Sequence, residues 1–144
     1  MVMADANQMP PSEAMNHRPL QTVLAILLAA TGGAIVLISL VQVVLGLAAI
    51  PGAGPGNATL DSEHRFYAVF FLAFGLALLW CLQDLSGRAR LIQGLMALFF
   101  LGGLTRVLSA LTTGLPHPLF VGLGVIELLL PPLLAGLAYL NRNT

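Results

Sequence analysis

Charged residues are scarce in this chain. Only 8% of its 144 residues are Asp, Glu, Lys or Arg, and all six basic residues are Arg. A soluble globular domain carries about a quarter charged residues, so this composition excludes a surface that faces water over most of its area. The formal net charge is zero. Because a nucleic-acid-binding domain needs a basic surface, the sequence predicts no nucleic-acid partner.

Residues that bind metals or perform catalysis are also few. Cys81 is the single cysteine, so no disulfide can form within the chain, and the three histidines lack the spacing of a metal site. The length allows one domain and leaves no room for a separate catalytic module. We therefore predict no metal, no cofactor and no catalytic residue, and the hypothesis of an enzyme is the weaker one.

Apolar sequence, in contrast, is abundant. The chain is 58% hydrophobic with a mean hydropathy of +0.91, and four apolar runs each approach or exceed the roughly 20 helical residues that cross a bilayer core. They predict helices at about residues 20–50, 64–83, 89–112 and 118–140. These helices form one membrane domain, residues 20–141. Residues 1–19 form a polar leader that we expect to be disordered.

The connections between these runs are short, which favours antiparallel neighbours. The sequence therefore predicts an all-α, integral membrane, four-helix antiparallel bundle. Arg18, Arg88, Arg90 and Arg142 fall on the side of the two termini and only Arg65 falls on the other side. Because cytoplasmic loops carry the excess of basic residues, both termini are expected in the cytoplasm. The chain is rich in Ala, Leu and Gly and has no Lys, a composition that resembles the proteins of GC-rich bacteria. We therefore expect the protein to lie in the bacterial inner membrane.

Two charged residues interrupt the last two apolar runs, Arg106 and Glu127. At a helical rise of about 1.5 Å per residue, Arg106 lies roughly 10 Å and Glu127 roughly 12 Å from the outer ends of their helices. An unpaired charge at such depth costs at least a few kcal/mol. The two residues are therefore predicted to form an ion pair.

Other polar residues gather at the same depth or at the outer ends of the helices. Gly102, Arg106 and Ser109 share one helix face, and Pro131 has no N–H to donate to the carbonyl of Glu127. The second helix begins with further charged and polar groups. The predicted polar pocket, for ligand binding or for structure, comprises Asp61, Glu63, Arg65, Tyr67, Arg106, Ser109 and Glu127.

Four segments carry a resemblance to a known family. They are DSEHRFY at 61–67, GGLTRVLS at 102–109, GLP at 114–116 and EL at 127–128. Together they resemble the bacterial membrane-protein family called domain of unknown function 4345, over about Leu20 to Asn141. The resemblance implies a four-helix inner-membrane protein with recurrent polar residues at these positions, and it implies no activity. The architecture also resembles the four-helix proteins related to DoxX.

Several functions fit these features. The leading hypothesis is an accessory or interaction subunit whose outer-facing pocket binds a small amphipathic ligand or braces a membrane protein partner or a second copy of the chain. An alternative is a small membrane enzyme, an isomerase or a redox-linked protein, acting on a lipid-soluble substrate, with Glu127 moving a proton. A transporter formed by an oligomer is a third. A purely structural ion pair that fixes helix register would explain Arg106 and Glu127 equally well.

Overall fold

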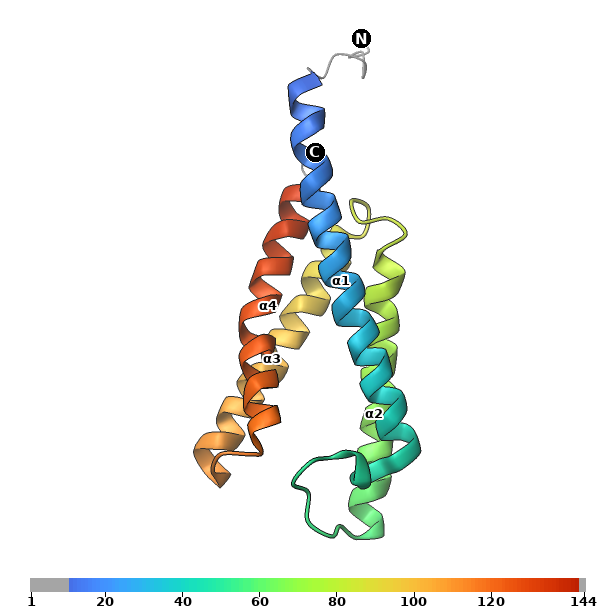
Figure 1. The fold of residues 1–144 in the computed structure, drawn as a ribbon, viewed down its shortest axis with the longest axis vertical. Coiled ribbons are helices and arrows are strands. Elements are labelled where there is room, and N and C mark those ends of the chain that lie inside the picture. The colour runs from blue at the N-terminus through green and yellow to red at the C-terminus, as the bar shows by residue number, and fades with distance from the viewer. Residues whose placement is uncertain (1–10, 143–144) are drawn as a thin grey trace.

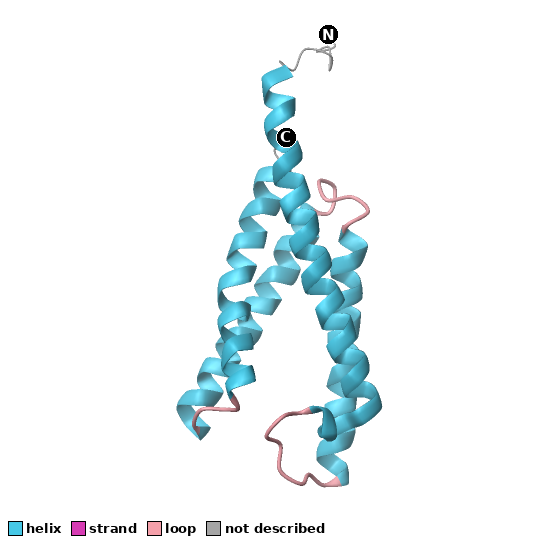
Figure 2. Cartoon of the chain, viewed as in Figure 1, coloured by secondary structure: helices cyan, strands magenta, loops and turns pink. Residues whose placement is uncertain are grey.

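The computed structural model describes residues 11–142, with side chains from residue 19 onward. It contains α1 (Pro11–Leu45), the short 3-10 helix η1 (Gly46–Ala49), α2 (Ala58–Cys81), α3 (Ala89–Thr113) and α4 (Pro118–Arg142). No strand occurs in this part of the chain (Figure 2). All four long helices have the length and apolar composition needed to cross a membrane. The all-α, four-helix membrane architecture is thereby confirmed.

The helix boundaries agree best in the second half of the chain. The limits of α3 and α4 lie within two residues of those predicted. α2 begins at Ala58, well before the predicted start at residue 64. The reason is an N-cap, because the side-chain oxygen of Asn57 accepts a hydrogen bond from the Leu60 N–H at 3.0 Å. Such caps stabilise a helix start even where the following residues are polar.

α1 differs from its prediction at both ends. It begins at Pro11, so the helix includes residues 11–19 of the predicted leader. Proline is favoured at the first helical position, and extending an existing helix avoids the cost of nucleation. Residues 1–10 of the predicted leader lie outside the described residues. At its other end α1 stops at Leu45, before a left-handed Gly46 with φ of 59°.

The four helices form two antiparallel hairpins (Figure 1). α1 packs along α2 and α3 packs along α4, whereas α1 meets α4 and α2 meets α3 over much shorter stretches. The hairpins touch at the end that holds the 82–88 turn, here called the joined end. They diverge toward the end that holds the 50–57 and 114–117 loops, here called the open end (Figure 1).

The buried core lies at the joined end. Leu24, Leu28, Leu78, Ile92 and Leu134 are fully buried there and belong to one cluster formed by all four helices. Many large apolar side chains elsewhere are exposed, which a chain surrounded by lipid tolerates. The core thus holds the hairpins together at one end only.

Small residues allow the helices of each hairpin to approach closely. A Cβ atom on Gly75 would lie 2.8 Å from Ile35 Cγ2 and 3.1 Å from the carbonyl oxygen of Gly32. A Cβ atom on Gly103 would lie 3.1 Å from Cβ of Glu127. By contrast, nothing lies within 4 Å of the corresponding position at Gly102. Packing therefore explains the first three glycines but not Gly102.

Candidate functional site

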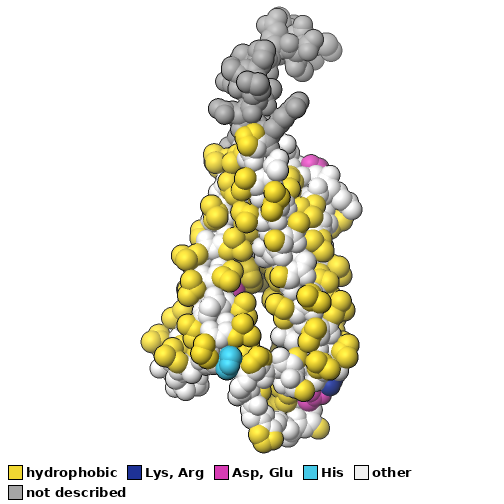
Figure 3. Space-filling model, in the orientation of Figure 1, with side chains coloured by type: hydrophobic (Ala, Val, Ile, Leu, Met, Phe, Trp, Pro, Cys, Tyr) yellow, Lys and Arg dark blue, Asp and Glu magenta, His cyan; other side chains and the backbone are white. Residues whose placement is uncertain are grey.

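A cleft of about 530 Å³ lies between the two hairpins. Most of its lining comes from α2 and α3, while α1 contributes Gln42 and α4 contributes Glu127. The space-filling view shows a slit between the hairpins in the half toward the open end (Figure 3). The divergence of the hairpins is what creates this space.

The polar end of the cleft is the ion pair between Arg106 and Glu127. The Nε of Arg106 donates to Oε2 of Glu127 at 2.6 Å. The Glu127 side chain is only 8% exposed and the Arg106 side chain is 38% exposed. Arg106 lies seven residues before the end of α3, hence about 10 Å from the open end of that helix. The predicted pairing of the two groups is present in the structure.

Arg106 retains hydrogen-bonding capacity beyond this contact. A guanidinium has five N–H groups, and only the one on Nε is hydrogen-bonded within the described residues. The guanidinium carbon lies 5.6 Å from the ring centroid of Phe120, near a small cavity of about 150 Å³ between α3 and α4. The terminal nitrogens therefore keep capacity to donate hydrogen bonds to a bound molecule.

Aromatic rings line the deeper wall of the cleft. The ring centroids of Phe71 and Phe74 are 6.4 Å apart, and those of Phe74 and Phe99 are 5.7 Å apart. Phe99 belongs to α3, so the contact between Phe74 and Phe99 crosses from one hairpin to the other. Tyr67 and Phe70 lie at the exposed edge. Aromatic rings therefore form a large part of the cleft wall away from the ion pair.

Three further polar residues face the cleft: Gln42, His64 and Thr105. The Nε2 atom of His64 is buried and has no hydrogen-bond partner among the described residues. The Thr105 hydroxyl donates to the Gly102 carbonyl at 2.7 Å. Gln42 and His64 come from the first hairpin, so polar groups lie on both sides of the cleft.

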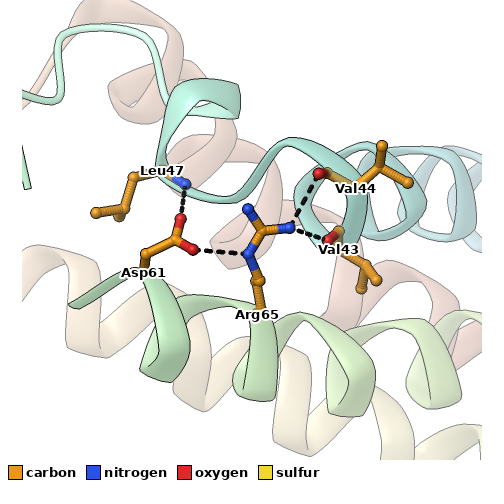
Figure 4. A network of polar contacts seen from close by, with 5 residues as sticks. All are labelled: Val43, Val44, Leu47, Asp61 and Arg65. Atoms are coloured by element: carbon orange, nitrogen blue, oxygen red, sulfur yellow. Dashed lines mark hydrogen bonds and ion pairs between the residues drawn. The ribbon is translucent and has the colours of Figure 1, made fainter. Parts of the chain in front are cut away.

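Asp61 and Arg65 lie away from the cleft and connect α2 to the end of α1 (Figure 4). Arg65 Nε donates to Asp61 Oδ2 at 2.7 Å, and Asp61 Oδ1 accepts from the Leu47 N–H at 2.9 Å. Arg65 Nη1 donates to the carbonyls of Val43 and Val44 at 2.5 and 2.9 Å. We call this contact the α1–α2 clasp. It satisfies carbonyls that the end of a helix leaves unpaired.

Of the seven residues predicted for the pocket, Tyr67, Arg106 and Glu127 line the cleft. Asp61 and Arg65 form the clasp instead. Glu63 is exposed outside the cleft. Ser109 does not line the cleft either, and its hydroxyl lies 3.4 Å from the Thr113 hydroxyl. A binding role for any of the seven stays a prediction.

The cleft residues that the prediction omitted carry a recognisable sequence signal. His64, Tyr67, Phe71 and Phe74 recur at intervals of three or four, which places them on one helix face. Continuing that face from Tyr67 would have added the histidine and the two phenylalanines. Gln42 offers no comparable signal, because it is an isolated polar residue in an apolar run.

The 50–57 loop reaches across the open end toward the second hairpin (Figure 1). A Cβ atom on Gly52 would lie 3.4 Å from Cβ of His117, which precedes α4. Gly52 has φ of 79°, a left-handed value that favours glycine. The two hairpins therefore approach each other again at their loops, beyond the cleft.

The described residues contain no group of three or more His, Cys, Asp or Glu side chains placed to hold a metal ion.

Neither a search of curated proteins nor a search of solved structures gave a match. The family described as Domain of unknown function (DUF4345) matches residues 23–138, which begin within the first membrane helix and end within the fourth. This chain is therefore a member of that family.

Proposed function

We propose that this protein binds a small amphipathic molecule in the cleft between its hairpins, and that it acts as a non-enzymatic accessory or interaction subunit. The observation that carries the proposal is the make-up of the cleft wall. The cleft combines one ion pair, Arg106 with Glu127, and a few uncharged polar side chains with a wall made largely of aromatic rings. Binding sites for small molecules combine a mainly apolar wall with a few convergent polar groups in this way.

The proposal includes a place in the cell. Arg88, Arg90 and Arg142 lie toward the joined end, and Arg65 lies toward the open end. This distribution supports a cytoplasmic joined end, in a bacterial inner membrane. The Arg106–Glu127 pair would then lie in the half of the bilayer that faces away from the cytoplasm.

Filling the cleft tests the proposal. Gly102 lines the cleft and has open space at its Cβ position, so Gly102→Leu adds a side chain at the cleft wall whose Cβ meets no neighbouring atom. Gly94→Leu is the matched control, because Gly94 is an exposed glycine of the same helix with equally open space outside the cleft. Both changes replace glycine by a better helix former.

The measurement is photolabelling of the purified protein in lipid nanodiscs by a photoreactive amphiphile, with the labelled peptides mapped by mass spectrometry. We expect labelling of the cleft-lining segments of α2 and α3 to fall several-fold in Gly102→Leu and to stay unchanged in Gly94→Leu. Equal labelling of the two variants would contradict the proposal. Chemical conversion of the bound amphiphile would favour the alternative of a small membrane enzyme.

A further inference from the structure

The charge balance and shape of the cleft point to a chemical class of ligand, an inference that rests on the proposed function. We propose that the ligand is an uncharged lipid whose head carries carbonyl or hydroxyl oxygens. It reaches the cleft sideways from the bilayer, between α2 and α3, with its head at Arg106 and Glu127.

The charge of the cleft favours an uncharged head. Its lining contains one cation and one anion, and these are already paired at 2.6 Å. The other polar lining residues, Gln42, His64 and Thr105, add no formal charge when histidine is neutral. A charged head would add an unbalanced charge about 10 Å inside an apolar region, where such charges are expensive.

Hydrogen-bonding capacity on both sides of the cleft favours oxygen atoms in that head. The terminal nitrogens of Arg106 have no acceptor among the described residues, and the second carboxylate oxygen of Glu127 has no donor. On the opposite hairpin, Nε2 of His64 is buried without a partner. Leaving such groups unpaired costs free energy. A carbonyl oxygen can accept from Arg106, and a hydroxyl can both donate to Glu127 and accept from Arg106.

The shape of the cleft favours access from the lipid. At the open end the 50–57 loop meets His117, which narrows the path from water. At the side, Phe70 of α2 and Leu98 of α3 line the cleft and are strongly exposed. These two helices contact each other over a short stretch only. An acyl chain between them would cover both apolar side chains.

Three photoreactive probes with the same alkyl chain test the proposal. One carries a glycerol ester head, one a sulfonate and one a trimethylammonium group. They are added to the full chain in nanodiscs at pH 8, above the range where imidazole is ordinarily charged. We expect the glycerol ester to label the cleft segments about tenfold more than either charged probe, and Gly102→Leu to abolish the difference.

A charge-changing variant tests the physical reason. Glu127→Gln keeps an oxygen that can accept from Arg106 but leaves a net positive cleft, so the preference should shift toward the sulfonate by about tenfold. Cleft labelling led by the sulfonate in the unaltered chain would overturn the uncharged ligand and leave the proposed function intact. An unchanged preference in Glu127→Gln, with the variant folded by its melting curve, would also overturn it. No cleft labelling by any probe would instead defeat the proposed function itself.

Discussion

At the scale of single residues, Arg106 and Glu127 depend on each other more than on the rest of the protein. The Glu127 carboxylate is almost fully buried, and its only hydrogen-bond donor among the described residues is Arg106. Removing one member of a buried pair leaves an uncompensated charge, which costs more than the pair itself contributes. The partial exposure of Arg106 reduces this cost without removing it.

A double-mutant cycle should reveal this dependence. We expect Arg106→Ala to lower the free energy of unfolding by about 1–3 kcal/mol, below the full cost of breaking a buried pair because Arg106 is partly exposed. The double variant with Glu127→Ala should cost clearly less than the sum of the two single changes. Thermal unfolding in a mild detergent gives the comparison. Strictly additive effects would mean that the pair contributes nothing as a pair.

Gly46 is the residue on which the α1–α2 clasp depends. Its φ is 59°, and an added Cβ atom would lie 2.0 Å from Oδ1 of Asp61 and 2.5 Å from Nη2 of Arg65. Gly46→Ala should therefore destabilise the protein by more than the about 1–2 kcal/mol that a left-handed backbone costs. Gly33→Ala is the control, since Gly33 is helical with nothing within 4 Å of its Cβ position. The melting temperatures of the two variants should move in opposite directions or differ by several degrees. Equal shifts would contradict the role of Gly46 in the α1–α2 clasp.

At the scale of the helices, close approach at Gly32 and Gly75 sets the spacing of α1 and α2. Gly75→Leu should force the two helices apart, at a cost of about 1–3 kcal/mol for overpacking. Gly136→Leu is the matched control, because Gly136 lies on the exposed side of α4 with open space around it. Unfolding in increasing SDS measures both variants. A Gly75→Leu variant as stable as Gly136→Leu would show that the helices are free to slide apart.

The helices themselves could be predicted because length and apolar composition determine them. Their lateral positions could not, since these depend on which small residues lie at a crossing. Gly32 and Gly33 are adjacent in the sequence, yet only Gly32 faces α2. A hydropathy pattern that is apolar around most of the helix does not distinguish the two.

The same ambiguity explains what the sequence predicted of the site. Depth along a helix follows from residue number, so the meeting of Arg106 with Glu127 could be predicted. Rotation about the helix is harder to fix. Asp61 and Arg65 occur at the expected end of α2, but they face α1, while His64 faces the cleft. Adjacent residues on a helix point about 100° apart, so a correct depth does not establish a common pocket.

At the scale of the whole molecule, the contact between Gly52 and His117 links the two hairpins beyond the cleft. A Cβ atom added at position 52 would lie 3.4 Å from Cβ of His117, close to the Cβ–Cβ range of a disulfide. With Cys81 replaced by Ala, we expect Gly52→Cys and His117→Cys to form a disulfide on mild oxidation, detected by mass spectrometry. Gly54→Cys with His117→Cys is the control, because nothing lies within 4 Å of the Cβ position at Gly54. Equal cross-linking in both pairs would indicate a loop without a fixed position.

This linked form also separates two routes into the cleft. If the ligand enters from the side, labelling of the cleft by the uncharged probe should be the same before and after oxidation. If it enters from the open end, the disulfide should slow labelling. Reduction with dithiothreitol should then restore the original rate, which controls for damage by the oxidant.

Each of the two described ion pairs lies within one hairpin, and each hairpin holds one of them. Asp61 and Arg65 belong to α2 and bind the end of α1, whereas Arg106 and Glu127 join α3 to α4. During synthesis, each pair of helices can therefore leave the translocon with its charges already neutralised, before the other pair has arrived. Neither ion pair depends on contact between the two hairpins. The apolar cluster at the joined end, to which all four helices contribute, then packs the hairpins together.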